Sequence, residues 1–149
     1  MAILVDTNVL LRSVQTHHSH YPIVERAFSV LRANHESLHV AVQNFVEFWA
    51  VASRPAGSEN GLGMTPETVA TELAVLKDLF ALLPEPASVF QDWEQLVTTY
   101  RVSGKNTHDA RLVAVMKAHG IGTILTFNVQ DFARYREITV LHPETLAGR

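Results

Sequence analysis

The amino-acid sequence predicts an α/β fold with an open, mainly parallel sheet of four to five strands between layers of helices. Short apolar runs alternate with segments of helical periodicity, and the first run is apolar at every position, as in a parallel strand covered on both faces. Parallel strands joined by helical crossovers connect such an alternation most simply. The predicted strands are Ala2–Val5, Leu38–Val42, Phe80–Leu83, Thr123–Thr126 and Ile138–Leu141.

The segments between these strands carry signals for helices. Thr65 is a suitable N-cap with Pro66 at the first helical position, and Gly120 is a suitable helix stop. The stretch Arg54–Pro66 is rich in glycine and proline and is a predicted loop. The predicted helices are Thr7–Val14, Ile23–Ala33, Gln43–Ser53, Pro66–Asp78, Ala87–Val102 and His108–His119.

The composition is that of an ordinary folded domain, with 47% hydrophobic and 18% charged residues among 149. A chain of this length forms a sufficient core, so we expect one domain over residues 1–149. No apolar run reaches the roughly 18 residues of a membrane span, and Asp6 comes too early for a signal-peptide core, so we expect a cytoplasmic protein with no membrane partner. Because the sequence has no cysteine, any metal site uses oxygen or imidazole ligands. The net charge is -3, so binding of a nucleic acid would need a local basic patch or cations.

Two predicted strands end at polar side chains. Asp6 follows the first strand, and the segment TFNVQDF places Thr126, Asn128 and Asp131 at the end of another. Ligands of open α/β sheets bind at the carboxyl ends of the strands. A capping role explains Asp6 equally well, and a capped turn explains Asp131 equally well, so neither segment decides the matter alone.

Two predicted helices carry further acids. Asp109 shares a helical stripe with Leu112, Val113 and Met116, which we expect to face the sheet, although an acid in the first turn of a helix is also stabilised by the helix dipole. Glu47 belongs to a polar arc for which a solvated face is the favoured explanation. That arc contains Gln43, Asn44, Glu47 and Arg54, and the opposite side carries Val42, Phe45, Val46, Trp49 and Ala52.

Together the four acids predict a cation site. If Asp6, Glu47, Asp109 and Asp131 meet at one edge of the sheet, they cannot all stay ionised without divalent cations. Hard oxygen ligands favour Mg²⁺ or Mn²⁺.

The motifs VDTNVLL, QNFVEFWAVASRP followed by NGLGMTPE, NTHDARLVAVMKAHG and LTFNVQDF resemble those of the PIN-domain ribonucleases, specifically the VapC-type toxins of bacterial toxin–antitoxin pairs. The resemblance runs from the first strand to the final HPETL. It implies a three-layer PIN-like fold, a metal-dependent endoribonuclease, an RNA substrate, an antitoxin partner and a homodimer.

The resemblance also implies roles for individual residues. Asp6, Glu47 and Asp109 match the three acidic positions of the family; Asn128 stands where the family often has a fourth acid, and Asp131 is expected to substitute for it. Asp6 and Asp109 would hold Mg²⁺ or Mn²⁺, and Glu47 would hold a metal or orient the attacking water. The polar groups that support these carboxylates would be Thr7, Asn8, Asn44, Thr126 and Asn128. The contacts to RNA would come from Arg12, Arg54, Lys105 and Arg111.

Two other α/β folds and one other functional class are alternatives to this interpretation. Asn8 stands where a haloacid-dehalogenase phosphotransferase needs a second Asp, and no Lys follows Lys117 as a receiver domain requires. A PIN-like domain that binds RNA or a protein without cleaving is the alternative from another functional class. The tract with His17, His18 and His20 is interpreted as a flexible loop outside the site. The large apolar residues Phe45, Phe48 and Trp49 favour a homodimer.

Overall fold

Five parallel strands form one sheet in the order β3-β2-β1-β4-β5 in the computed structural model, which describes residues 1–147. Residues 148 and 149, which we included in the predicted domain, lie outside the described part. All five predicted strands are confirmed to within one residue at each end. The strands are β1 (Ala2–Val5), β2 (Ser37–Ala41), β3 (Ala81–Leu83), β4 (Thr123–Leu125) and β5 (Thr139–Leu141).

The helices fill the connections between the strands. Six of them match the predicted ones, with shifted ends, and two short ones, α7 and α8, were not predicted. Their bounds are α1 (Thr7–Ser13), α2 (Tyr21–Ala33), α3 (Val42–Ala52), α4 (Pro66–Leu79), α5 (Val89–Thr99), α6 (Asn106–Ala118), α7 (Val129–Phe132) and α8 (Pro143–Ala147).

The largest error in the predicted ends concerns α5, which we expected to span Ala87–Val102. The helix ends at Thr99 because Arg101 adopts a left-handed backbone conformation with a φ of 53°. A right-handed helix cannot continue through such a residue.

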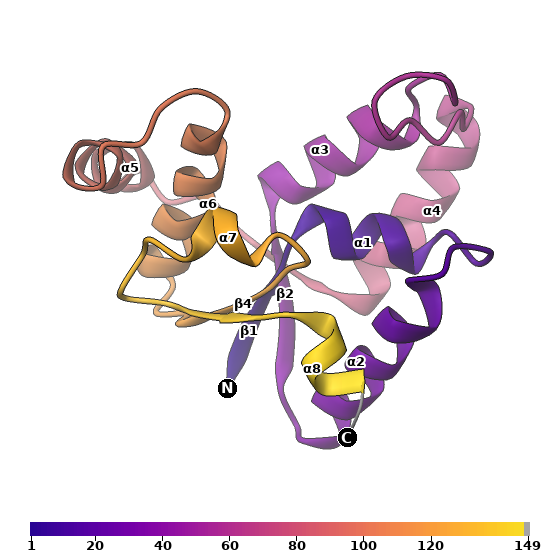
Figure 1. The fold of residues 1–149 in the computed structure, drawn as a ribbon, viewed down its shortest axis with the longest axis horizontal. Coiled ribbons are helices and arrows are strands. Elements are labelled where there is room, and N and C mark those ends of the chain that lie inside the picture. Colours follow the sequence, from indigo (N-terminus) through magenta and orange to yellow (C-terminus); the bar gives the residue numbers. More distant parts are fainter. Residues whose placement is uncertain (148–149) are drawn as a thin grey trace.

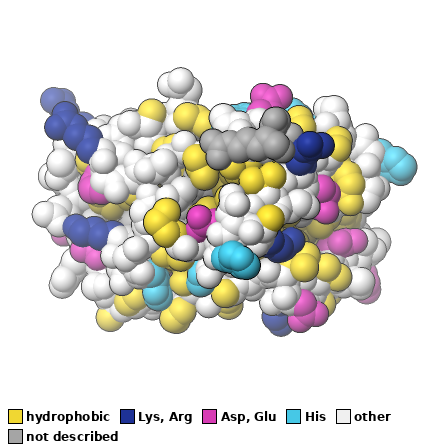
Figure 2. Space-filling model, turned by 90° about the horizontal axis from the view of Figure 1, so that it is seen from below, with side chains coloured by type: hydrophobic (Ala, Val, Ile, Leu, Met, Phe, Trp, Pro, Cys, Tyr) yellow, Lys and Arg dark blue, Asp and Glu magenta, His cyan; other side chains and the backbone are white. Residues whose placement is uncertain are grey.

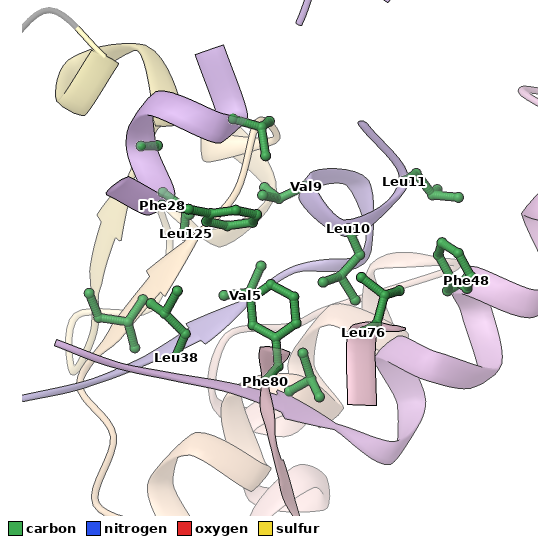
Figure 3. Close-up of a cluster of buried hydrophobic side chains, with 14 of the residues drawn as sticks. Val5, Val9, Leu10, Leu11, Phe28, Leu38, Phe48, Leu76, Phe80 and Leu125 are labelled. Carbon is green, nitrogen blue, oxygen red and sulfur yellow. The ribbon is translucent and has the colours of Figure 1, made fainter. Parts of the chain in front are cut away.

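The sheet separates two hydrophobic clusters, which makes the fold three-layered (Figure 1). Helices α1 to α4 and α8 pack on one face, and α5 to α7 pack on the other. Successive side chains of β1 pack on opposite faces of the sheet, with Ile3 and Val5 in the first cluster and Leu4 in the second. Within the first cluster, the rings of Phe28 and Phe80 meet edge to face at 5.3 Å (Figure 3).

The path of the chain reverses at the carboxyl ends of β1 and β4. These strands are neighbours, but the segment after β1 leads into α1 on one face and the segment after β4 leads into α7 on the other. Ligands of open α/β sheets bind at such a reversal of strand order.

Charged side chains are scattered over the opposite end of the molecule. Seen from below, at the amino ends of β1 and β2, basic and acidic groups lie interspersed on the visible surface (Figure 2). Within residues 1–147, no helix has the length and apolar character needed to cross a membrane.

Candidate active site

Asp6 lies at the carboxyl ends of the neighbouring strands β1 and β4. Its backbone N–H donates to the carbonyl oxygen of Leu125 at 3.0 Å, which fixes it at the end of both strands. Its Oδ1 accepts from the N–H of Thr7 at 2.8 Å, and its Oδ2 accepts from the hydroxyl of Thr126 at 2.8 Å. The residue is only 6% exposed. Asp6 is therefore the N-cap of α1, as one of our two interpretations held, and it is also a buried, rigidly held carboxylate at the expected edge of the sheet.

Asn8 joins the segments that follow β1 and β4. Its Nδ2 donates to the Thr126 hydroxyl at 3.1 Å and to Oδ2 of Asp6 at 3.4 Å, while its Oδ1 accepts from the N–H of Phe127 at 3.1 Å. The Thr126 hydroxyl accepts a further bond from the N–H of Asn128 at 3.0 Å. Asn128 thus supports the site through its backbone N–H, and the residue itself is exposed.

The polar arc of α3 faces the site, so our favoured explanation of a solvated face is wrong. Asn44 is fully buried; its Nδ2 donates to the Thr7 hydroxyl at 3.1 Å, and its Oδ1 accepts from the N–H of Ala41 at 2.8 Å. The Thr7 hydroxyl in turn donates to Oε1 of Glu47 at 3.3 Å. The solvent side of α3 is instead apolar, with Val46 62% exposed.

Asp109 and Asp131 reach the site from the other helical layer. Asp109 is in the first turn of α6 and Asp131 is in α7, and both residues are half-buried. The neighbours of Asp109 on its stripe are buried, as expected: Leu112, Val113 and Met116. The α6 end is tied to α3 by Gln43, whose Nε2 donates to the carbonyl oxygen of His108 at 2.8 Å.

The four carboxylates influence one another electrostatically. Burial is the largest cause that raises the pKa of Asp6 to about 6; bonds from Thr126 and Thr7 oppose the rise, and the charges of Glu47 and Asp131 add to it. Burial also raises the pKa of Asp109 to about 7, with further contributions from Asp6, Asp131 and Glu47. These contributions place Glu47 and Asp131 within electrostatic reach of both Asp6 and Asp109.

The chemistry of this donor set fits a hard divalent cation. The four side chains offer only oxygen ligands, and the pKa values of Asp6 and Asp109 are raised. A bound cation would offset both the cost of burying their negative charges and the repulsion between them. In residues 1–147, no three acidic or histidine side chains already stand close enough together to hold an ion. The four acids are thus a candidate ligand set that has to draw together around a metal.

The four basic residues that we predicted to contact RNA lie in different surroundings. Lys105 and Arg54 are exposed, and the guanidinium of Arg12 donates to Oε1 of Gln15 at 2.7 Å. Arg111 forms an ion pair with Glu85 at 2.7 Å, so its charge is already partnered.

Sequence reasoning missed Arg134 and underrated Gln43. Arg134 is a cation that lowers the pKa of Asp109, and it lies two residues beyond the end of α7. Its closeness to Asp131 in the sequence was the available signal. Gln43 is buried and connects α3 to α6. Its membership of the arc with Asn44 was visible in the sequence, but the direction of that arc was not.

Comparison with known proteins agrees with this architecture. The chain matches the PIN domain family over residues 3–138 and therefore belongs to that family. Members of this family are generally nucleases. A sequence search of curated proteins finds no match.

Three solved structures illustrate the similarity of fold. VapBC2 from Rickettsia felis, bound to a DNA fragment from its promoter, aligns with a TM-score of 0.73 at 15% identity, over 95% of this chain and 98% of that one. VapBC-1 from nontypeable Haemophilus influenzae aligns with a TM-score of 0.68 at 16% identity, over 96% and 98% of the two chains. VapC20 from Mycobacterium tuberculosis, a toxin that cleaves the sarcin-ricin loop, aligns with a TM-score of 0.63 at 20% identity, over 88% and 93%. At these identities the comparison establishes the fold.

Proposed function

We propose that this protein is a metal-dependent endoribonuclease that hydrolyses phosphodiester bonds of RNA. The observation that carries the proposal is that four carboxylates, from the end of β1 and from α3, α6 and α7, face the carboxyl ends of β1 and β4 within electrostatic reach. Membership of the PIN domain family supports a nuclease. The sarcin-ricin loop cleaving toxin among the similar structures supports RNA as the substrate.

Asp6 and Asp109 would hold Mg²⁺ or Mn²⁺, with Glu47 and Asp131 completing the acidic set. Bound there, the cation would supply positive charge to the scissile phosphate and would lower the pKa of the attacking water. Thr126 and the N–H of Thr7 fix the two oxygens of Asp6, so this carboxylate is oriented before any cation arrives. The Thr7 hydroxyl orients Glu47, which is less buried than Asp6 and is placed to align the water or take its proton.

Hydrolysis in this arrangement is an in-line displacement at phosphorus. Water adds its oxygen to phosphorus, the bond to the 3′-oxygen breaks, and the 3′-oxygen leaves as a hydroxyl after taking up a proton. The products are a 5′-phosphate end and a 3′-hydroxyl end.

Cleavage of single-stranded RNA by the purified chain with Mg²⁺ or Mn²⁺ tests the proposal. We expect Asp6→Asn and Asp109→Asn to fold normally and to lose about 100-fold or more in rate, because each removes a charge from the cation site. Asp92→Asn is the matched control, since Asp92 also occupies the first turn of a helix but lies in α5. Equal cleavage by Asp109→Asn and the parent would refute the site, and RNA binding without any cleavage would favour the alternative of a binding module.

We further propose that the protein is the toxin of a VapBC-type pair, acts in the cytoplasm, and is restrained by a cognate antitoxin. The support is the similarity to chains from VapBC and other toxin–antitoxin complexes. The proposal predicts that a small antitoxin is encoded beside this chain and that the purified antitoxin suppresses its cleavage of RNA.

A homodimer is the expected assembly, although not through all the residues we first considered. Phe48 is fully enclosed in the core, whereas Phe45, which is 9% exposed, belongs to the core and also lines the groove described next. The exposed apolar surface instead combines the outer side of α3 with β3 around a groove of about 490 Å³, lined in part by Val46, Trp49 and Leu82. We propose that two copies pair across this surface.

A further inference from the structure

The histidine tract that we placed outside the site packs directly beside it. The ring of His20 stacks on the ring of Phe127 at 4.7 Å with an angle of 13° between the planes. The ring of His18 lies 5.0 Å from that of His20, and the ring of His142 meets Phe127 edge-on at 5.2 Å. Phe127 is bonded through its N–H to Asn8, which also contacts Asp6. The aromatic cluster is therefore connected to the carboxylates through one residue.

The loop that carries His18 has a defined conformation. The N–H of His18 donates to the carbonyl oxygen of Gln15 at 2.9 Å, and the N–H of Tyr21 donates to that of His18 at 3.0 Å. The N–H of His20 donates to Nδ1 of His18 at 3.0 Å. Because Nδ1 accepts this bond, the neutral ring of His18 carries its proton on Nε2, where it is a hydrogen-bond donor.

His18 forms one wall of a surface groove of about 450 Å³. The same loop contributes Val14 and His17, and the other wall is formed by Leu62 and Met64 from the loop between α3 and α4. We call this the His18 groove. It combines an aromatic ring and apolar side chains with the polar groups of Gln15 and Thr16 at its edge.

The opposite wall is held in place by backbone bonds to the end of α3. The N–H groups of Leu62 and Met64 donate to the carbonyl oxygens of Val51 and Ala52 at 3.3 and 2.9 Å. Between them, Gly63 has a φ of 65°, a conformation that L side chains rarely adopt. Glycine at this position thus lets the loop present two apolar side chains to the groove.

One face of α1 leads from the carboxylates to the His18 groove. Asn8 and Arg12 are separated by one helical turn and lie on the same face. Asn8 contacts Asp6, while Arg12 bonds to Gln15, which lines the groove. A phosphodiester backbone that follows this face would meet a carboxylate-held cation first and a guanidinium one turn later.

We propose that the His18 groove binds one nucleobase of a single-stranded RNA whose backbone passes Arg12 on its way to the carboxylates. This rests on the proposed function, since it names a substrate subsite of the same enzyme. An aromatic wall and apolar side chains suit the π-face of a base, and the Nε2–H of His18 with the polar groups of Gln15 and Thr16 suit its hydrogen-bonding edge. The neighbouring guanidinium of Arg12 suits a phosphate, so the ligand has both parts of a nucleotide.

The test uses a mixed-sequence single-stranded RNA containing all four bases, whose cut position is mapped first with the parent chain. A matched set of RNAs then lacks one base at a time along the whole RNA while keeping every phosphate, so that binding can be compared even where no cut is found. We expect one abasic position to lower the cleavage rate at limiting RNA, and the affinity measured by fluorescence anisotropy, by about ten-fold. In His18→Ala the same abasic change should have no effect, because the base has lost its wall.

Two further variants separate recognition from folding. His18→Phe keeps an aromatic wall but loses the Nε2–H donor, so it should keep part of the abasic penalty. His35→Asn changes an exposed histidine with a positive φ elsewhere on the chain and should behave as the parent does. A general loss of structure in His18→Ala would weaken intact and abasic RNAs alike. An abasic penalty that persists in His18→Ala would overturn the proposal. That result is expected if the variant weakens both RNAs equally, and also if it weakens neither because the groove serves a protein.

The subsite and the proposed function fail in distinguishable ways. Cleavage that depends on Asp109 but is insensitive to every abasic change overturns the groove and leaves the nuclease standing. Coupling between His18 and one base in the binding measurement, without cleavage, supports the groove and overturns the nuclease. An RNA that is neither cleaved nor bound overturns both.

Discussion

Replacing Asp109 by Asn should stabilise the metal-free protein at pH 8, although it destroys the proposed site. The pKa of Asp109 is raised to about 7 by burial and by three neighbouring acids, compared with an ordinary value of 3.8. The folded chain therefore binds a proton that the unfolded chain has lost, and stability falls as the pH rises from about 3.8 to about 7. Asparagine is neutral at every pH and avoids this loss.

The size of the effect follows from the same values. The difference between the two pKa values corresponds to about 4 kcal/mol, at about 1.36 kcal/mol for each tenfold change in proton affinity. Asp109 is half-buried, so solvent screening reduces this to about 2 kcal/mol. The variant also loses the attraction between a carboxylate and the N-terminus of α6, which is worth at most about 1 kcal/mol. The expected gain at pH 8 is thus about 1–2 kcal/mol.

The free energy of unfolding of the parent and of Asp109→Asn can be measured at pH 5 and pH 8 by urea unfolding with a chelator present, followed by tryptophan fluorescence. The parent should lose stability between the two pH values, and Asp109→Asn should lose clearly less. Asp92→Asn controls for the helix end, because Asp92 occupies the first turn of α5. If Asp109→Asn were destabilised equally at both pH values, the electrostatic argument for a crowded acidic site would be refuted.

Three other outcomes are expected. Mg²⁺ or Mn²⁺ at about 100 times its dissociation constant should stabilise the folded chain by about 2.7 kcal/mol near neutral pH and by less in acid, as thermal unfolding can measure. Asp131→Asn should be more stable than the parent without metal and should gain less from Mn²⁺; an unchanged gain would place Asp131 outside the site. Val46→Glu should convert the dimer to a monomer in sedimentation, whereas Glu25→Gln, an exposed change on α2, should leave it dimeric.

The sequence was sufficient to predict the sheet and the residues at its edge. Buried parallel strands are apolar at successive positions, so Ala2–Val5 and its counterparts stand out. Asp6 and Thr126 directly follow two such strands, and the parallel arrangement brings them to the same edge. The short helix α7 could not be predicted in this way, because four residues carry too little periodicity. Arg134 was missed for the same reason.

The direction of α3 could not be predicted because a helical wheel shows which residues share a side and not where that side points. The usual assumption turns the apolar side to the core. In this protein, the polar side is the one that must be enclosed, since Asn44 and Gln43 bond to groups on neighbouring elements.

These bonds connect the site to the surface that we assign to the dimer. Rotating α3 to bury Val46 would break the bonds of Asn44 to Thr7 and Ala41 and leave buried polar atoms without partners, at a cost of about 1–3 kcal/mol each. The part of the helix that carries Val42, Val46 and Trp49 is therefore held outward by the requirements of the carboxylate site. A second copy of the chain that covers Val46 and Trp49 would therefore pack beside the part of α3 that carries Glu47, so the dimer surface and the carboxylate site share one helix.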